Sequence, residues 1–479
     1  MKHKSATAMK RVLSRLIFEI FFYVKMRSLI FFFISVFTIL SFVAVEHFAK
    51  GDLPILLWWT QQIYPHPSEN ITLIRCGNVK CYSTKSRGYL DNKNTKGILF
   101  YGTGIDPLDL PLPRTQDHEW CLFHEESPLN NYLLSHEHFI QLFNHTATFK
   151  RESDYQYTTQ DIFALEYLTE RQAIDIKVKN EKRKSDGFAA LMYTQSHADV
   201  PSYRDSYVEE LMKYIDVDSY GTCLHNKDLP ENLTNPEESF QKDQFLDFIA
   251  GYKFHLSFEN AVCDDYMTEK LMRPLHLGSV PIYYGSPKAK DWMPNNHSII
   301  MVNDFKSPME LAEFIKYLDE NDEEYLKYLD FKKPNGISNK LLKETVLNRD
   351  WGSHDHKYYF YNIEDKVDYY QGFECHVCRE IHKRTNALKE HEKDPSWFPK
   401  PPPKMADNSH LGCPKPFSPL SGHEIPSSHW SFTYEDTKTV ADAVVEMLRR
   451  GEEDPSLTYM YYTQLKKKQK QNSQNTGEL

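Results

Sequence analysis

The twelve residues ENAVCDDYMTEK, at positions 259–270, gather four carboxylates, a cysteine, a tyrosine and a lysine into one short stretch. The adjacent aspartates Asp264 and Asp265 suggest a metal site, because hard cations prefer carboxylate oxygens as ligands. Two neighbouring aspartates in a loop are also typical of solvated or capping residues, and an oxygen-rich metal site needs more ligands than this pair. The chemistry of the stretch therefore depends on its two ends.

At one end, Glu259 and Asn260 close an apolar run that predicts a strand, and open α/β sheets bind their ligands where such strands end. At the other end, Thr268 has the side chain of a helix N-cap, which puts Glu269 and Lys270 in the first helical turn. Free N–H groups and the helix dipole make such a turn attractive to anions. Glu269 can in addition accept hydrogen bonds from the hydroxyls of a ribose.

A second cation occupies a similar position. The pattern SYRDSYVEELMKYI predicts a helix over 202–215, with Ser202 as its N-cap and Asp205 three residues later. Arg204 then lies in the first turn, as Lys270 does in the other helix. Two such cations at one cleft can hold a diphosphate without a metal; the alternative is that both are ordinary surface charges.

Short apolar runs alternate with helical patterns through most of the chain. Several runs are continuously apolar, as expected where helices cover both faces of a parallel sheet. Repeated strand–helix units of this kind indicate an α/β fold with parallel sheets. The predicted strands cover residues 55–59, 97–102, 120–126, 188–196, 253–260, 280–285 and 298–302.

The basic, polar stretch KVKNEKRKSDG at 177–187 has the composition of an interdomain linker. It divides the folded part into two α/β halves, 52–180 and 188–365, with a cleft between them. A segment at 366–385 carries a C-x-x-C motif and returns to the first half. We expect the C-terminal extension, 386–479, to be loosely ordered in part, because it is rich in proline or strongly polar.

The N-terminal region differs from the rest. Residues 29–45 are apolar and uncharged, about the shortest length that spans a bilayer. Seven Lys or Arg residues precede them within 1–28 and little positive charge follows, so the positive-inside rule places the N-terminus in the cytosol. A cleaved signal peptide is the alternative, but no A-x-A-like site follows. We expect a signal anchor and a type II membrane protein of the endoplasmic reticulum or Golgi, with the catalytic part in the lumen.

The remaining composition agrees with a folded protein in an oxidising compartment. The formal net charge of −10 gives no support for nucleic-acid binding. The eight cysteines are an even number, which suits disulfides. Zinc or disulfides are the alternatives for four of them, with disulfides favoured in the lumen: Cys76, Cys81, Cys375 and Cys378. Four N-x-S/T sequons are candidate glycosylation sites: Asn70, Asn144, Asn232 and Asn296.

The stretch KFHLSFENAVCDDYMTEK, followed by GSVPIYYGSP, closely resembles the donor-binding signature of the α1,3-fucosyltransferases, glycosyltransferase family 10. The shared elements are a strand ending in FEN, then DY-x-TEK, then a V-P-x-x-x-G turn at matching spacing. The likeness covers about residues 54 to 380 and includes SYRDSYVEELMKYIDVDSYG and FECHVC. The sequences FHEESP, LPLPR and NAVCDDY and the long extension are similar to the fucosyltransferase 10 and 11 subgroup in particular.

The resemblance implies a GT-B fold of two Rossmann-like domains, with GDP-fucose in the second half and the acceptor facing the first. It also implies an inverting reaction that needs no metal and no cofactor besides the GDP-fucose donor. Arg204 and Lys270 would then neutralise the diphosphate. The remaining donor-binding residues would be Glu259, Asn260, Tyr266 and Glu269.

An inverting transfer at fucose C1 needs a base that takes the proton of the acceptor hydroxyl. In the family this is a Glu just before Ser-Pro in the first half, which here is Glu126. Glu125 would point the opposite way along an extended chain, so only one of the two faces the cleft. From the residues alone, either glutamate is simply a polar side chain at the end of a strand.

The family also pairs its N-terminal cysteines with the C-x-x-C, which supports two disulfides, with the individual pairings open, among Cys76, Cys81, Cys375 and Cys378. We expect a third bridge between Cys223 and Cys263, because SYGTC and ENAVC end predicted neighbouring strands. Cys121 and Cys413 are left unassigned. Asn144 is either glycosylated or a packed polar residue.

The subgroup likeness implies transfer to Ser or Thr hydroxyls of folded cysteine-rich, EMI-type protein domains. The general family likeness implies instead O3 of N-acetylglucosamine in an N-glycan or lactosamine unit. The residues themselves do not decide between the two, and we favour the protein acceptor because the N-terminal features match the subgroup best. A third hypothesis is a catalytically silent lumenal binding protein on the same scaffold, against which the presence of Glu126, Arg204 and the TEK sequence argues.

Overall fold

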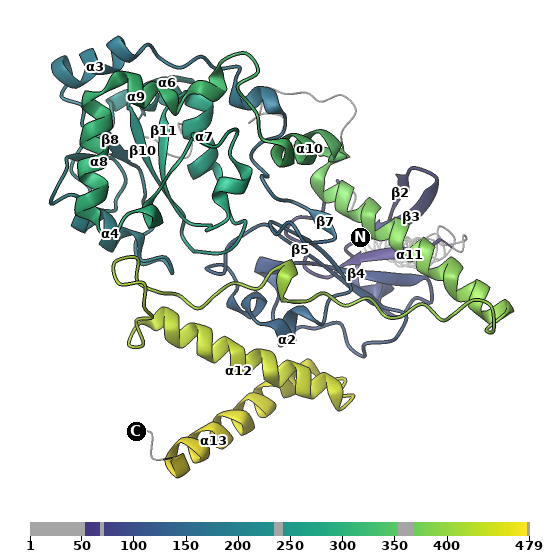
Figure 1. Ribbon diagram of the computed structural model, residues 1–479. Coiled ribbons are helices and arrows are strands. Elements are labelled where there is room, and N and C mark those ends of the chain that lie inside the picture. Colours follow the sequence, from purple (N-terminus) through teal and green to yellow (C-terminus); the bar gives the residue numbers. More distant parts are fainter. Residues whose placement is uncertain (1–52, 68–70, 234–242, 353–366, 477–479) are drawn as a thin grey trace, which may run out of the picture. The chain divides into compact units, whose positions relative to one another are not determined.

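The computed structural model describes residues 53–67, 71–233, 243–352 and 367–476 (Figure 1). The predicted signal anchor at 29–45 lies outside these residues, as does the sequon at Asn70. Within the described residues, no helix combines the length and the apolar character that crossing a membrane requires.

The first half of the chain builds a seven-stranded sheet in the order β2-β3-β1-β4-β5-β6-β7. Neighbouring strands are parallel, except for the antiparallel hairpin of β2 and β3. β1 and β5 are buried along their whole length, which explains why their sequences are apolar without alternation. The strands are β1 (Ile55–Trp58), β2 (Thr72–Cys76), β3 (Val79–Thr84), β4 (Thr95–Tyr101), β5 (Glu119–His124), β6 (His145–Thr148) and β7 (Tyr155–Gln156).

The second half builds a five-stranded, wholly parallel sheet in the order β12-β11-β10-β8-β9. Its strands are β8 (Leu191–Tyr193), β9 (Val217–Ser219), β10 (Phe254–Phe258), β11 (Val280–Tyr284) and β12 (Ile300–Met301). Helices flank this sheet (Figure 1): α3 (Ile176–Ser185), α4 (Arg204–Leu211), α6 (Asp243–Ile249), α7 (Glu269–Leu277), α8 (Pro308–Glu320), α9 (Asp322–Lys327) and α10 (Lys340–Asn348). The two sheets confirm the predicted α/β class and its parallel strands.

The stretch predicted as an interdomain linker, 177–187, instead forms most of α3. Lys179 in this helix is buried and donates to the backbone oxygens of Tyr252 and Gly278, each at 2.9 Å. The linker interpretation is wrong. A basic composition suggests solvated lysines, but Lys179 is buried because its hydrogen-bond partners come from distant segments of the chain.

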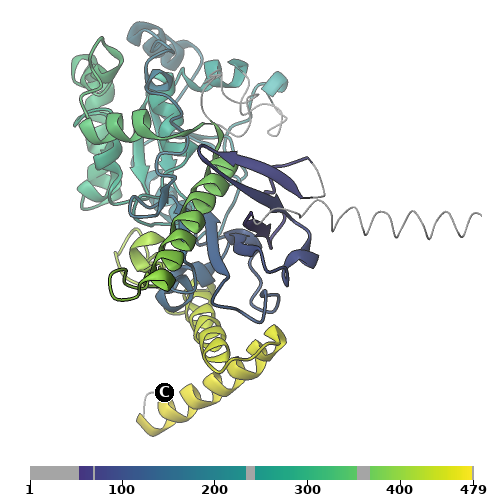
Figure 2. The ribbon, with the colours of Figure 1, turned by 90° about the vertical axis from the view of Figure 1, so that its right-hand side faces the viewer.

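The C-terminal extension, which we expected to be loosely ordered in part, is largely helical. α11 (Tyr369–Lys393) carries the C-x-x-C and continues into the extension, which also contains α12 (His429–Arg449) and α13 (Thr458–Thr476). α11 packs along β2, β3 and β4, and α12 and α13 form a helical hairpin (Figure 2). Val444 and Met447 of α12 are fully buried in one core with Phe139 and Phe143 of the first half. Burial of each large apolar side chain contributes about 1.5–3 kcal/mol, so the extension belongs to the folded unit.

Three disulfides staple the structure: Cys76–Cys375, Cys81–Cys378 and Cys263–Cys413. The first two join the β2–β3 hairpin to α11, between the pairs of cysteines that were expected to form bridges. The expected bridge between Cys223 and Cys263 is wrong, because Cys263 is bonded to Cys413 and Cys223 is a buried free thiol. The physical reason lies in the strand order: β8 separates β9, which precedes Cys223, from β10, which precedes Cys263. Cys121 is also a buried free thiol.

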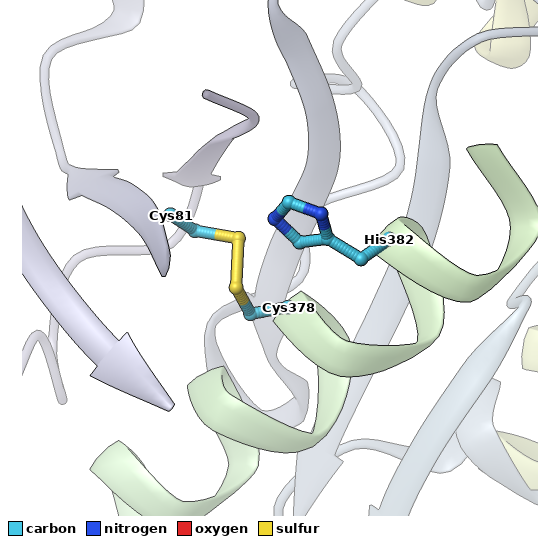
Figure 3. A group of neighbouring side chains, drawn as sticks. All are labelled: Cys81, Cys378 and His382. Atoms are coloured by element: carbon cyan, nitrogen blue, oxygen red, sulfur yellow. A yellow bond between two sulfur atoms is a disulfide. The ribbon is translucent and has the colours of Figure 1, made fainter. Parts of the chain in front are cut away.

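Cys81 of β3 lies beside Cys378 and His382 of α11, with the candidate ligand atoms of the three residues within 4.8 Å of one another (Figure 3). Both sulfurs belong to one disulfide, so neither is a thiolate that zinc can bind. His382 Nε2 instead lies 2.9 Å from the carbonyl oxygen of Lys80. The four cysteines therefore form two disulfides, and the alternative of a zinc site is wrong.

Asn144, a predicted glycosylation site, is buried. Its Oδ1 accepts hydrogen bonds from Trp120 N at 2.8 Å and Arg114 Nη2 at 3.1 Å, and its Nδ2 donates to Lys404 O at 2.7 Å. The side-chain amide is buried and hydrogen-bonded inside the protein. The glycosylation prediction at Asn144 is therefore wrong, and Asn144 is a packed polar residue. Asn232 and Asn296 are exposed.

We predict that Cys413→Ser lowers the free energy of unfolding by about 2–5 kcal/mol, because the Cys263–Cys413 bridge closes a long loop of the unfolded chain. Cys223→Ser, which removes a buried thiol without breaking a bridge, is the matched control and should cost clearly less. Denaturant unfolding measures both, and mass spectrometry of non-reduced peptides checks the pairing. Equal losses for the two variants, or a peptide joining Cys223 to Cys263, would contradict the assignment.

Candidate active site

Glu126 lies two residues beyond the end of β5, where its side chain is half-buried. Burial raises the pKa of the Glu126 carboxyl, Lys270 lowers it and Glu269 raises it, with a net increase above the usual value. Lys270 and Glu269 form the first turn of α7, on the second sheet. The structure therefore brings Glu126 from the first half into electrostatic contact with the predicted anion site of the second half.

Glu125 has different neighbours. One of its carboxylate oxygens accepts a hydrogen bond from the Tyr101 hydroxyl at 3.2 Å, and the other is buried with no partner in the described part of the chain. Burial raises the pKa of Glu125 to about 8. Of the two adjacent glutamates, Glu126 is the one whose pKa responds to the charges at the start of α7.

The start of α7 is fixed by a buried carboxylate. Glu259 is fully buried, and its two oxygens accept hydrogen bonds from Thr268 N and Thr268 Oγ1, each at 2.8 Å. Thr268 is the N-cap, as predicted, and its Oγ1 accepts from Lys270 N. Burial raises the pKa of Glu259 to about 7. Glu259 thus stabilises the N-terminus of α7 from within the protein and does not line an open cleft.

Lys270 remains a cation in this environment. Its Nζ lies 3.1 Å from Glu269 Oε1 and 3.9 Å from Glu259 Oε2. Burial lowers the pKa of Lys270, but the attraction of Glu269 and Glu259 outweighs it, and the net pKa is raised. A permanently charged ammonium at a helix N-terminus is a suitable partner for a phosphate group.

Arg204 is the first residue of α4, but it is only 1% exposed, so the surface-charge alternative is wrong for this residue. Its Nη1 donates to Phe258 O at 3.1 Å and its Nη2 to His197 O at 3.0 Å, while Nε is buried and has no partner among the residues that the structure describes. Arg204 also lowers the pKa of Lys270, which places the two cations within electrostatic reach.

The predicted N-cap of this helix is wrong. Tyr203, in the left-handed conformation at φ 49°, directly precedes α4. The Ser202 hydroxyl instead donates to the backbone oxygen of Glu259 at 2.7 Å, and Ser202 N donates to Asn260 O at 3.0 Å. Ser202 thereby ties the segment before Arg204 to the end of β10.

Tyr266 and Asn260 complete the predicted donor set. The Tyr266 ring is buried edge-on against Phe149, with 5.1 Å between the ring centroids, and the charge of Glu126 adds to the increase that burial causes in the pKa of its hydroxyl. Asn260 is half-buried, and its Oδ1 has no hydrogen-bond partner within the described residues. Tyr266 therefore lies within electrostatic reach of Glu126, whereas Asn260 contacts Ser202 through its backbone oxygen.

Asp161 was not predicted. Burial raises its pKa to about 8, with Glu269 and Glu259 adding to the increase, and Lys270 and Arg273 opposing it. One of its carboxylate oxygens is buried and has no hydrogen-bond partner among the described residues. No motif surrounds Asp161 in the sequence, so only the tertiary structure shows that it reaches the start of α7.

Asp265, first considered as a metal ligand, is bound by other residues. It is 2% exposed, adopts φ 62°, and its oxygens accept hydrogen bonds from Arg151 Nε at 2.8 Å, Arg151 Nη2 at 2.6 Å and Trp292 Nε1 at 2.8 Å. Burial raises the pKa of Asp265, but the hydrogen bonds from Arg151 and Trp292 hold it below its usual value. This clamp joins Arg151, which follows β6, to the loop between β10 and α7.

Two family models match the chain: "Fucosyltransferase, N-terminal" over residues 51–159, and "Glycosyltransferase family 10 (fucosyltransferase) C-term" over residues 181–397. The chain belongs to glycosyltransferase family 10. As a member of this family it is a fucosyltransferase, and both halves of the site described above lie within the matched region or next to it.

Relatives of this fucosyltransferase cover most of its length. The GDP-fucose protein O-fucosyltransferase 3 of Xenopus tropicalis is 45% identical over 408 residues, which are 84% of this chain and 82% of the relative. The Homo sapiens protein of the same name is 44% identical over 420 residues, 86% of this chain and 83% of the relative. A crystal structure of an alpha1,3-fucosyltransferase with GDP-fucose covers 64% of this chain and 94% of that chain, with 17% identity and a TM-score of 0.38.

We predict that Arg151→Ala lowers the free energy of unfolding by about 3 kcal/mol, because it leaves the buried Asp265 carboxylate without its cation. It should also raise KM for the donor nucleotide sugar, since the loop that carries Tyr266 and Lys270 loses its clamp. Arg449→Ala, which removes an exposed ion pair with Glu446, is the matched control and should cost at most about 1 kcal/mol. Equal effects of the two variants would show that the clamp does not position the loop.

Proposed function

We propose that this fucosyltransferase transfers L-fucose from GDP-β-L-fucose to Ser or Thr hydroxyls of folded cysteine-rich, EMI-type protein domains. The reaction is inverting and independent of a metal. The names of relatives at 44% and 45% identity, which state a GDP-fucose donor and a protein acceptor, support this assignment. Within the site, the observation that carries it is the electrostatic contact of Glu126 with Lys270 and Glu269 across the two halves.

In this mechanism the acceptor oxygen forms a bond to fucose C1 while the bond from C1 to the diphosphate oxygen breaks. The Glu126 carboxylate takes the hydroxyl proton as the new bond forms. GDP leaves with the electron pair of the broken bond, and Lys270 and Arg204 compensate its negative charge. Attack opposite to the leaving group converts the β linkage of the donor into an α linkage in the product.

The same proposal includes the setting of the enzyme. We assign its two parallel sheets to a GT-B arrangement, with the donor on the second sheet and the acceptor on the first. Residues 29–45 serve as a signal anchor of a type II membrane protein, with the folded part in the lumen of the endoplasmic reticulum or Golgi. Three disulfides and the exposed sequons at Asn232 and Asn296 support a lumenal environment.

The deciding experiment incubates the full-length chain, purified in detergent, with GDP-fucose and EDTA. Two acceptors are compared: a folded EMI-type domain, and an N-glycan ending in N-acetylglucosamine. We expect transfer to the protein domain, with fucose found on Ser or Thr by mass spectrometry. Transfer to the glycan alone would replace the acceptor assignment, and loss of activity in EDTA would rule out the metal-independent mechanism.

Glu126→Gln should lower kcat by about 10²–10⁴-fold, since the amide cannot take the acceptor proton. Its affinity for GDP should be unchanged, because the positive charges of Lys270 and Arg204 remain. Glu125→Gln is the matched control, one residue away and next to Tyr101, and should retain most of kcat. Retained activity in Glu126→Gln would remove this residue as the base.

The pH dependence gives an independent check on Glu126. A base acts in its deprotonated form, so kcat/KM is complete above the pKa of Glu126 and is lost as pH falls through it. Burial raises that pKa above the usual value of 4.5, so the acid limb should lie above pH 4.5. A pH–rate profile measures the limb, and one at or below pH 4.5 would show that a group other than this buried carboxylate controls activity.

A further inference from the structure

A cavity of about 850 Å³ lies beside the candidate active site. Four parts of the fold line it: the segment Ser135–His138, Lys150 after β6, the loop after β10 at Asp264, and the C-terminal extension at Cys413 and α12. The volume falls within the range of binding sites for organic ligands and is far larger than a single side chain. The predicted donor and catalytic residues do not line it.

Several polar groups of the lining have no partner within the described residues. Lys150 is only 6% exposed, yet its ammonium group makes no hydrogen bond or ion pair there. The Ser135 hydroxyl is buried without a hydrogen-bond partner among the described residues, whereas Lys438, at the rim on α12, is exposed and forms no ion pair with any of them. Burying the donors of Lys150 and Ser135 without an acceptor costs free energy, and a ligand that supplies acceptors recovers it.

The chemistry of the lining distinguishes between kinds of ligand. Lys150 and Lys438 are accompanied by the carboxylates of Glu137, Asp264 and Asp442. A simple anion therefore gains little net attraction. A polypeptide segment offers carbonyl oxygens to the amines and N–H groups to the carboxylates, so it matches both.

The cavity adjoins the site of fucosyl transfer through two residues. Asp264 belongs to the loop that carries Tyr266 and Lys270, and Lys150 follows Phe149, which packs on the Tyr266 ring. Tyr266 in turn lies within electrostatic reach of Glu126. A polypeptide in the cavity would border the proposed catalytic base.

We propose that this cavity is a docking subsite for the polypeptide of the acceptor protein, with Lys150, Lys438 and Ser135 as hydrogen-bond donors to it. The inference rests on the protein acceptor of the proposed function and adds the surface that selects it. Because Cys413 and α12 form part of the wall, the C-terminal extension is a component of acceptor recognition.

The test measures steady-state transfer by the full-length enzyme to the EMI-type domain, with Lys438→Met and Ser135→Ala as variants. We expect each to raise KM for the domain, by about tenfold for Lys438→Met as for one lost hydrogen bond to a charged group, with kcat and KM for GDP-fucose unchanged. Lys468→Met, at an exposed lysine of α13 away from the cavity, is the matched control and should leave KM for the domain unchanged. If KM for the domain is unchanged in both cavity variants, the docking subsite is wrong.

A labelling experiment gives a second readout that does not depend on turnover. An amine-reactive reagent should modify Lys438 and Lys468 in the free enzyme, and the EMI-type domain should protect Lys438 alone. Protection of Lys438 by a free oligosaccharide of N-acetylglucosamine, and not by the domain, would overturn the polypeptide assignment. If the wild-type enzyme transfers no fucose to any protein, the proposed function fails; if it does and the cavity variants behave normally, only the docking subsite fails.

Discussion

The clamp between Arg151 and Asp265 determines where the loop between β10 and α7 lies. Asp265 is 2% exposed, so its charge depends on Arg151 and Trp292 rather than on water. Arg151 follows β6 of the first sheet, whereas Asp265 lies between β10 and α7 of the second. Loss of Arg151 would lower the free energy of unfolding, because a buried carboxylate without its cation is strongly destabilising. The placement of Tyr266 and Lys270 near Glu126 depends on this constraint.

Charge balance at the start of α7 follows from that placement. Burial raises the pKa values of Glu126, Glu259 and Asp161, while Lys270 opposes the increase at each of them. Glu269, which lies beside Lys270 and Arg273, has a pKa lowered to about 2 although burial acts to raise it. Neighbouring carboxylates with pKa values pushed apart can take different protonation states at one pH, which is the arrangement that acid–base chemistry needs.

The extension after the C-x-x-C is connected to both halves of the fold. α12 packs on the first half, and Cys413 forms a disulfide with Cys263 in the loop between β10 and α7. Trp430 Nε1 donates to Asp199 O at 3.1 Å, and Tyr203, just before Arg204, hydrogen-bonds to Ser428. These contacts give a segment of polar and proline-rich composition a fixed place beside the proposed site.

The elements whose cause is local could be predicted from the amino-acid sequence alone. Continuous apolar runs predicted the buried strands of the two sheets, and Thr268 predicted the start of α7, because N-capping depends on a few neighbouring residues. The motif around Glu126 and Lys270 indicated the family, which the family models confirmed. These predictions needed no knowledge of distant contacts.

The features that depend on distant partners could be identified from the three-dimensional structure but not from the sequence. Lys179 and Arg204 read as surface charges but are buried, because carbonyl oxygens from remote segments satisfy them. The partner of Cys263 follows from the order of strands in a sheet, and that order is not written in any single stretch. Asp161 reaches α7 without a motif, since electrostatic contact depends on distance in space and not on spacing along the chain.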